Sequence, residues 1–370
     1  MMSLCAALAK RVKFFGVFSL STVLSLPALL LSGLAVSTFS EPAVAADQAK
    51  KEVVKIYSYR QPFLINPMLE AFTKKTGIKT EVVWGKGLVE RMRSEDKLTE
   101  ADLLLTVDIG RLTEAVEKGV VQPVDSDVLK ANIPAKYRSA NNDWFGLTVR
   151  SRVIYASKER VKQDAITYEE LSDPKWRGKI CVRPGHHVYN VAMIASMIKH
   201  HGKDWTKTWL EGVKANLARK PSGNDRGQVK AVYSGQCDLA IGNTYYMGKM
   251  LTNEKKPEQK KWAASVKILF PNTETRGAHV NLSGVVLAKY ASNKAGAIKL
   301  MEFLSSEDAQ KIYAELNYEY PVKPGVAWSD LVKSWGAFKA DPVALDEIAK
   351  LRKQAVNLVD ETNFNAGPSS

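Results

Sequence analysis

The chain has 370 residues, with 53 Lys and Arg against 39 Asp and Glu, so it carries a formal net charge of +14 at pH 7. This length is enough for two domains with cores of their own. The basic residues are spread along the sequence without a dense run or a recognition-helix pattern, which argues against binding of nucleic acid. A positive field of this kind suits an anionic ligand or an acidic partner surface.

The first 46 residues have the pattern of a cleavable secretory signal. Basic residues at 10–13 precede an apolar stretch at 14–36, and small residues at 43–46 supply a cleavage site. The alternative is an N-terminal membrane anchor, against which the proline within the apolar stretch and the cleavage motif argue. No later stretch reaches 18 apolar residues. We therefore expect export, and a soluble mature protein without membrane insertion.

In the first half of the mature chain, segments with the apolar pattern of strands alternate with segments that have the apolar periodicity of helices. The predicted strands are 53–59, 79–84 and 101–106, and the predicted helices are 66–75, 88–94 and 112–118. This alternation predicts βαβ units and a mainly parallel sheet. A longer apolar strand at 144–155, with charged residues inside it, is expected to cross between two domains.

A second α/β pattern follows this strand. Its predicted elements are strand 179–181, helices 189–201, 205–216 and 226–235, strand 238–241 and helix 245–251. Strand 284–288 and helix 295–304 are expected to return to the first domain, and the tail at 342–359 to be helical. The fold class is thus α/β, with two lobes joined by two crossings and a ligand cleft between them. We expect an N-lobe of 47–150 and 273–323, and a C-lobe of 151–272 and 324–370.

Two cysteines remain after the leader, Cys181 and Cys237. Two cysteines in an exported chain usually form a disulfide, whereas a zinc site would need further ligands at suitable spacing. We therefore predict a Cys181–Cys237 disulfide that closes a loop of about 55 residues and stabilises the fold. It would tie the strand before Tyr189 to the strand before Tyr245.

Three tyrosines are candidate ligands for a hard, highly charged cation. Tyr245 and Tyr246 follow the turn residues 242–244, and neighbours at a helix start are about 100° apart, so both can face one cleft. Tyr189 opens an amphipathic helix whose N-terminus favours a phenolate. Phenols titrate near pH 10, so a metal must displace their protons. The alternative is three ordinary half-buried tyrosines.

Arginines form a second candidate set. Arg60 and Gln61 follow the first predicted strand at its carboxyl end, where open α/β sheets bind ligands. Arg150 and Arg152 are two residues apart on a strand and hence on one face. An arginine fork there can hold a small planar anion through two hydrogen bonds. Surface ion pairs are the alternative.

Other chemistries have weaker support. The five histidines include pairs at 186–187 and 200–201, which lie at opposite ends of one predicted helix and cannot share a zinc ion unless the chain folds back. The sequence has no Gly-x-Ser-x-Gly, Gly-x-Gly-x-x-Gly, Walker or His-Glu-x-x-His motif. We therefore expect no catalytic residues and no enzymatic activity.

Segments 57–65, 144–148, 189–190, 242–246 and 319–322 resemble the bacterial periplasmic ferric-ion-binding proteins. Members of that family have a transferrin-like, two-lobe (type II) solute-binding fold and serve ABC importers. The resemblance covers essentially the whole mature chain, and its most specific part is the tyrosine pair after Gly-Asn-Thr. It implies a periplasmic, monomeric receptor that passes Fe3+ to a membrane permease.

The resemblance also implies the site, with Fe3+ bound by Tyr189, Tyr245 and Tyr246. Some family members add a histidine and a tyrosine from the first lobe, but Gln61 and Pro62 stand at those places here. The chain is therefore similar to the subgroup in which three tyrosines bind iron and a synergistic carbonate or bicarbonate completes the coordination sphere. In that subgroup the anion would be held by Arg60, Gln61 and one arginine of the 150/152 pair, of which Arg150 is preferred.

Two other functions remain open from the sequence. One is a periplasmic binding protein for a small anion such as phosphate or a sulfonate, with the arginines as its main ligands. The other is an exported hydrolase that uses His186 or His187 as a base.

Overall fold

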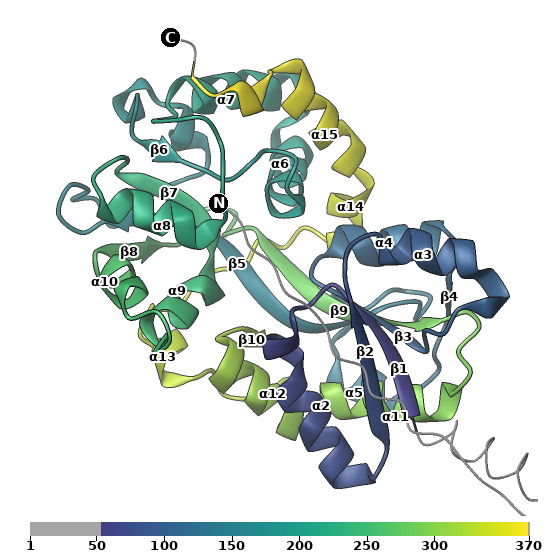
Figure 1. Cartoon of the computed structure of the whole chain (residues 1–370). Helices are drawn as coiled ribbons and strands as arrows, with labels where there is room; N and C mark the ends of the chain where they lie inside the picture. Colours follow the sequence, from purple (N-terminus) through teal and green to yellow (C-terminus); the bar gives the residue numbers. More distant parts are fainter. Residues whose placement is uncertain (1–52, 369–370) are drawn as a thin grey trace, which may run out of the picture. The chain divides into compact units, whose positions relative to one another are not determined.

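The computed structural model describes residues 53–368, so the predicted signal peptide lies outside the described residues. Its first part contains β1 (Val53–Ser58), α2 (Pro62–Thr76), β2 (Lys79–Trp84), α3 (Leu88–Glu95), β3 (Leu103–Thr106), α4 (Ile109–Glu117), β4 (Val121–Gln122) and α5 (Asp127–Asn132) (Figure 1). The first helix shows how the sequence sets such boundaries. It begins with Pro62, whose fixed φ suits a first helical position, and ends at Gly77, whose φ of 74° favours glycine. The predicted βαβ order is confirmed here, since β1 pairs in parallel with both β2 and β3.

The sheet as a whole is mixed, so the prediction of a mainly parallel sheet was wrong. Of the nine strand pairings within residues 53–368, only β1–β2, β1–β3 and β6–β7 are parallel. The others involve β5 (Phe145–Ser157) or β9 (Val280–Ala288), which run antiparallel to their partners. The physical reason for the error is that a buried strand has the same apolar pattern whether its neighbours run parallel or antiparallel to it, so the sequence does not reveal its direction.

The strand β5 belongs to both halves of the sheet. It pairs with β9 as far as Ser151 and with β7 (Leu239–Asn243) from Arg152 onward. All 13 of its residues are buried. Figure 1 shows β5 and β9 as the long paired strands between the two lobes. The charged residues inside this strand are therefore interior residues, not surface ones.

The second part of the chain adds β6 (Ile180–Cys181), α6 (Val188–His201), α7 (Lys203–Ala215), α8 (Asp225–Tyr233), α9 (Thr244–Leu251), α10 (Glu258–Ala264) and β8 (Val266–Leu269). After β9 come α11 (Lys294–Ser305), α12 (Glu307–Ile312), a short π-helix (Tyr313–Asn317), β10 (Tyr320–Pro321) and α13 (Asp330–Lys333). The tail at 342–359, predicted to be helical, forms two helices, α14 (Leu345–Lys350) and α15 (Arg352–Glu361), which meet at Leu351. The apolar spacing continues across this break, so periodicity alone did not reveal it.

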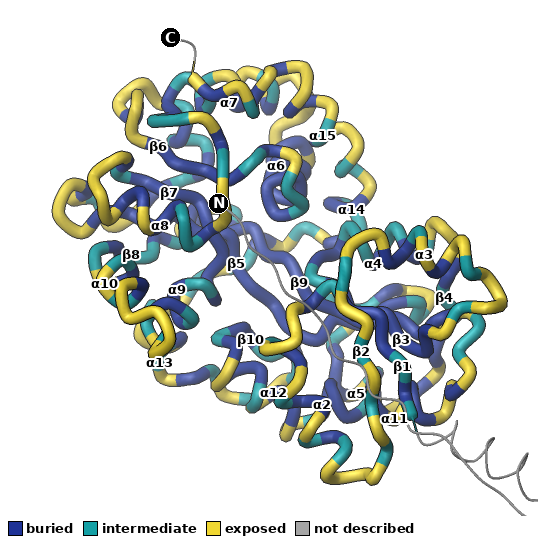
Figure 2. The backbone as a smooth tube through the Cα atoms, in the orientation of Figure 1, coloured by how far each residue is buried: buried dark blue, intermediate teal, exposed yellow. Residues whose placement is uncertain are grey.

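Two main hydrophobic cores lie in the two lobes. The first combines residues between 54 and 149 with residues between 280 and 349, and the second combines residues between 154 and 269 with residues between 348 and 364. Helix α14 contributes to both, through Leu345 and Ala349 in the first core and Ile348 in the second. Figure 2 shows the same division as buried strands flanked by helices with exposed outer faces.

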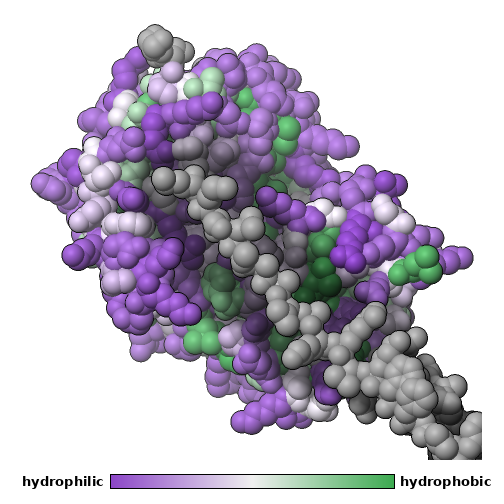
Figure 3. Space-filling view, viewed as in Figure 1, coloured by the Kyte–Doolittle hydropathy of each residue, from purple (hydrophilic) through white to green (hydrophobic). Residues whose placement is uncertain are grey.

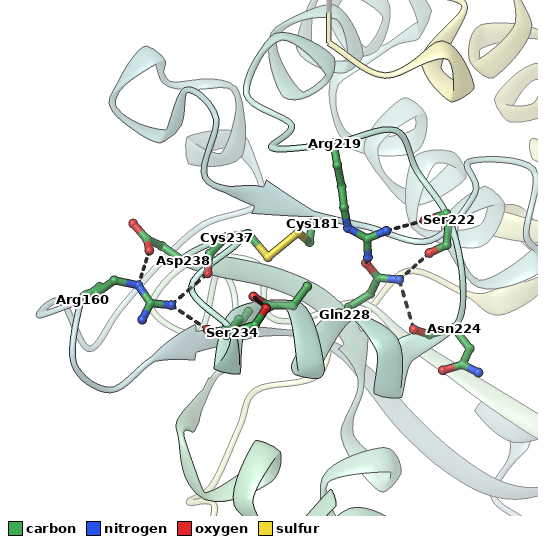
Figure 4. Close-up of a disulfide and its surroundings, with 11 residues drawn as sticks. Arg160, Cys181, Arg219, Ser222, Asn224, Gln228, Ser234, Cys237 and Asp238 are labelled. Carbon is green, nitrogen blue, oxygen red and sulfur yellow. Dashed lines mark hydrogen bonds and ion pairs between the residues drawn. A yellow bond between two sulfur atoms is a disulfide. The ribbon is translucent and has the colours of Figure 1, made fainter. Parts of the chain in front are cut away.

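The predicted disulfide is confirmed. Cys181 at the end of β6 is bonded to Cys237, just before β7, with the two Cα atoms 5.9 Å apart (Figure 4). Both cysteines are buried, and their strands are parallel neighbours.

The coloured part of the surface in Figure 3 is mainly hydrophilic. Within residues 53–368, none of the helices has the length and apolar character needed to cross a membrane.

Candidate metal centre

The three candidate phenols line one cavity of about 280 Å³. Tyr189 is the second residue of α6, and Tyr245 and Tyr246 are the second and third residues of α9. The hydroxyl oxygens of Tyr189 and Tyr245 are 3.2 Å apart. The rings of Tyr245 and Tyr246 are stacked, with centroids 4.3 Å apart. Tyrosines separated by 56 residues in the sequence are thus brought into direct contact.

The turn before the tyrosine pair is held tightly against β5. A Cβ atom at Gly242 would lie 2.2 Å from Cε2 of Tyr155, so only glycine allows this close approach. The Tyr155 hydroxyl donates to the carbonyl of Asn243. The Thr244 hydroxyl accepts a hydrogen bond of 3.3 Å from the backbone N–H of Ser151. The Gly-Asn-Thr sequence therefore fixes the point from which α9 starts.

A histidine caps the helix that carries Tyr189. The Nδ1 atom of His187 accepts a hydrogen bond of 3.3 Å from the backbone N–H of Tyr189. Burial, followed by the nearby guanidinium groups of Arg183 and Arg152, lowers the pKa of His187 to about 3. The ring is therefore neutral at pH 7, as its role as an acceptor requires.

The environment of the phenols disfavours their ionisation in the absence of a cation. Burial raises the pKa of Tyr245 well above the ordinary value for a phenol, and the neighbouring Tyr189 and Tyr246 raise it further. Burial is also the main cause that raises the pKa of Tyr246, followed by Tyr189 and the carboxylate of Asp225. Both side chains are neutral at physiological pH, so an ion that binds phenolates here has to displace protons.

Arg150 lines the same cavity and has a guanidinium edge without hydrogen-bond partners in the described part of the chain. Its Nη1 donates to the Ser283 hydroxyl at 3.0 Å, while Nε and Nη2 are buried and have no hydrogen-bond partner within residues 53–368. These two donors lie on the same edge of the guanidinium plane, which is the arrangement that binds a carboxylate or carbonate through two bonds. Arg150 lines the cavity, 5.6 Å from the ring centroid of Tyr189. Buried donors without partners are uncommon in proteins, and a bound ligand or water is one explanation for them.

Arg60 and Gln61 also line the cavity. The Nη2 atom of Arg60 is 2.7 Å from a carboxylate oxygen of Glu319, and Nη1 donates to the Ser283 hydroxyl. The Nε of Arg60 is buried without a partner in the described part of the chain. Gln61 is the residue before α2 and is exposed. Ser283 thus connects the guanidinium groups of Arg60 and Arg150.

Arg152 has a different environment, although it is only two residues from Arg150. All of its Nη contacts are internal, with Asp225, Asn243 and Asn190. It is not among the residues that line the cavity. Of the two arginines that the sequence left open, Arg150 is the one that faces the cavity.

The cavity is more positive than the sequence predicted. Its lining within residues 53–368 includes one carboxylate, Glu319, and seven cationic side chains, of which five were not predicted: Lys86, Arg111, Arg183, Arg226 and Lys249. Arg183 follows the end of a strand, so the rule that identified Arg60 could also have identified it. Arg226 lies over the ring of Tyr246, with its Cζ 5.1 Å from the ring centroid, a contact that no local sequence pattern reveals.

Three of the five histidines each contact a different carboxylate. His186 lies 2.7 Å from Asp360, His200 lies 2.8 Å from Asp341, and His201 lies 2.7 Å from Glu169. Within the described residues, no group of three or more His, Cys, Asp or Glu side chains is placed to hold a metal ion. The phenol cluster is therefore the metal site for which the geometry gives support.

Comparison with known proteins gives consistent matches. Residues 99–338 match the family described as bacterial extracellular solute-binding protein. The chain is 43% identical over 324 residues to iron uptake protein A1 of Synechocystis sp., covering 87% of this chain and 90% of that protein.

Solved structures match over a similar length. The apo ferric ion-binding protein A of Pasteurella haemolytica is 53% identical, with a TM-score of 0.82, and the match covers 85% of this chain and 98% of that one. A Trichodesmium protein solved in complex with iron and citrate ligands is 42% identical, with a TM-score of 0.80 and coverage of 84% and 99%. The two-lobe fold predicted from the sequence is confirmed by these neighbours.

Proposed function

The chain belongs to the family of bacterial extracellular solute-binding proteins, and we propose that it is a periplasmic receptor that captures ferric iron between its lobes and delivers it to an ABC importer. Tyr189, Tyr245 and Tyr246 bind the ion as phenolates. The observation that carries this proposal is the convergence of these phenols in a cavity that Arg150 also lines. The names of the relatives, an iron uptake protein and a ferric ion-binding protein, support the choice of cargo.

The charges of the cavity support a bound anion as well. One Fe3+ and three phenolates are together neutral, and hard oxygen ligands suit such a cation. A carbonate or bicarbonate at the open coordination positions makes the site anionic, and arginines must compensate that charge. Arg150 offers two free donors for this anion, and Arg60 and Gln61 border the same space. The chemistry is coordination only, so we assign no catalytic residue.

The same proposal includes the boundaries of the two lobes, the export of the protein and its membrane partner. The N-lobe consists of 47–150 and 273–323 and the C-lobe of 151–272 and 324–370, a division supported by the change of partner strand within β5. The first hydrophobic core also includes Val332, Leu345 and Ala349 from the last of these segments. Residues 1–46 form a signal peptide that directs the monomeric receptor to the periplasm. Its partner is the permease of an ABC transporter.

The decisive experiment is a titration of iron-stripped protein with ferric nitrilotriacetate, with and without bicarbonate, followed by visible absorption. We expect a phenolate-to-iron charge-transfer band that is strongly reduced in Tyr245→Phe and Tyr246→Phe. The matched control is Tyr233→Phe, since Tyr233 is exposed at the end of α8 and does not line the cavity. Arg150→Lys should retain the band but lose most of its dependence on bicarbonate, because one ammonium cannot replace a two-donor edge.

Two results would contradict the proposal. One is a colourless iron complex, or a band that survives both tyrosine substitutions. The other is tight binding of phosphate or a sulfonate to metal-free protein, measured by calorimetry, that is unchanged in the tyrosine variants. That second result would favour the anion-binding alternative, in which the seven cationic side chains are the ligands.

A further inference from the structure

A buried guanidinium connects the two chain segments that carry the phenols. The Nη2 atom of Arg152 donates to Oδ1 of Asn190 at 2.6 Å, and its Nη1 atom donates to Oδ1 of Asn243 at 3.1 Å. Asn190 directly follows Tyr189 on α6, and Asn243 is the residue from which α9 begins. One rigid, planar group therefore bonds the neighbour of one phenol and the starting point of the helix that carries the other two.

A carboxylate at the start of α8 completes this arrangement. Asp225 is fully buried, and its Oδ2 accepts hydrogen bonds from Nη1 of Arg152 and from the backbone N–H of Asn243, both at 3.0 Å. Its Oδ1 accepts from Nη1 of Arg183 at 3.0 Å. Burial alone would raise the pKa of Asp225, but Arg152 and Arg183 hold that pKa below its usual range, so the group is a carboxylate at neutral pH.

The bonds extend to the loop before α6. The side-chain amide of Asn190 donates to the carbonyls of Arg183 and Pro184, at 3.0 and 3.1 Å. The side chain of Asn190 thus accepts a hydrogen bond from Arg152 through its oxygen and donates to the loop through its nitrogen. These bonds fix the orientation of the Asn190 side chain as well as its distance from Arg152.

We propose that Arg152 and Asp225, with Asn190 and Asn243, form a strut that sets the position of Tyr189 relative to the Tyr245–Tyr246 pair without contacting the ion. This inference rests on the proposed function and assigns a positioning role to an arginine that the sequence had offered as an anion ligand. A tetrahedral or octahedral set of oxygens tolerates only small displacements, and outer residues that orient metal ligands typically contribute 10- to 100-fold in metal affinity.

The strut requires arginine specifically. Its fork reaches two carboxamide oxygens and one carboxylate at once, whereas the single ammonium of lysine keeps the charge but cannot hold all three in the same plane. Arg152→Lys therefore removes the geometry while leaving a cation beside Asp225. Asp225→Asn removes the carboxylate in a side chain of nearly the same shape. Arg160→Lys is the matched control, because Arg160 lies in the same lobe, pairs with Asp238 and does not line the cavity.

The first measurement is ferric affinity by competition with nitrilotriacetate, together with the wavelength of the charge-transfer band. We expect Arg152→Lys and Asp225→Asn to weaken iron binding by about 10- to 100-fold and to shift the band, with an unchanged dependence on bicarbonate. Arg160→Lys should change neither. A variant that loses thermal stability but keeps wild-type affinity and wavelength would show a structural role only, and loss of the bicarbonate dependence would identify Arg152 as an anion ligand. Either result overturns the strut.

A second measurement needs no iron. Iron-free protein labelled with 3-fluorotyrosine gives 19F resonances that Phe substitutions assign to Tyr189, Tyr245 and Tyr246. We expect these three resonances to shift or broaden in Arg152→Lys, while that of the exposed Tyr233 stays in place. Unchanged resonances would refute the strut whether or not iron binds. Absence of a band in the wild-type protein would instead refute the proposed function.

Discussion

Iron binding should release three protons, and this count can be worked out from the site. Phenols are protonated at neutral pH, and burial with neighbouring phenols raises the pKa values of Tyr245 and Tyr246 further above 7. Each phenol that becomes a ligand therefore loses one proton. Since one proton contributes about 1.4 kcal/mol per pH unit, three protons make binding about 4 kcal/mol weaker for each unit of acidification, or roughly a thousandfold. The sign is fixed: binding strengthens as the pH rises and weakens as it falls.

The perturbation that tests this count is Tyr246→Phe. It removes one ionisable ligand, so proton release should fall from three to two and the pH dependence to about a hundredfold per unit. Bicarbonate that binds as carbonate would add one proton to both values, and for this reason the comparison should be made at one fixed bicarbonate concentration. The difference between wild type and variant is independent of that contribution.

The assay is a pH-stat measurement during addition of ferric nitrilotriacetate to iron-free protein, corrected for protons taken up by the released chelator. Calorimetry in two buffers with different heats of ionisation gives the same number independently. Release of two or fewer protons by the wild type would refute the reasoning. So would equal release by wild type and Tyr246→Phe, because that would mean the phenol of Tyr246 is not a ligand.

Two predictions concern the residues that support the site. Gly242→Ala places a Cβ atom 2.2 Å from Tyr155, so we expect a loss of about 1–3 kcal/mol in the free energy of urea unfolding and weaker iron absorption. Gly227→Ala on α8 should be neutral or stabilising, because its Cβ would meet only Oδ1 of Asn224 at an ordinary 3.8 Å. An unchanged urea midpoint for Gly242→Ala would contradict the packing argument. Replacing Cys181 and Cys237 together by serine should reduce stability by about 2–5 kcal/mol, and a reductant should then have no further effect on the urea midpoint.

Much of the fold could be predicted from local patterns. Hydrophobic periodicity located β1, β2 and the helix that begins near Tyr189, because these signals depend only on which face of each element is buried. The disulfide followed from two cysteines in an exported chain, and the structure confirms it. Strand direction was not predictable in the same way. A buried strand such as β9 has the same apolar sequence pattern whether its neighbours run parallel or antiparallel to it.

In the candidate site too, residues with a local sequence signal could be predicted, whereas residues placed by tertiary packing could not. The tyrosine pair was visible because its two members are adjacent and follow a turn. The cationic lining was largely invisible, since Arg226 and Lys249 reach the cavity from helices whose orientation depends on tertiary packing. Positions at the carboxyl ends of strands are the exception, and Arg60 and Arg183 both obey that rule.

The different environments of Arg150 and Arg152 arise from the strand pairing of β5. Both residues lie near the ring of Tyr189, with Cζ atoms 5.6 and 5.9 Å from its centroid, as expected for positions two apart on one face. Arg150 is opposite Asn281 of β9, whereas Arg152 is opposite Asn243 of β7. The change of partner strand gives Arg152 a carboxamide and the buried carboxylate of Asp225, which accept from its Nη1, and leaves Arg150 with one hydroxyl. Buried donors without partners cost about 1–3 kcal/mol, so the free edge of Arg150 is the one that a bound anion would stabilise.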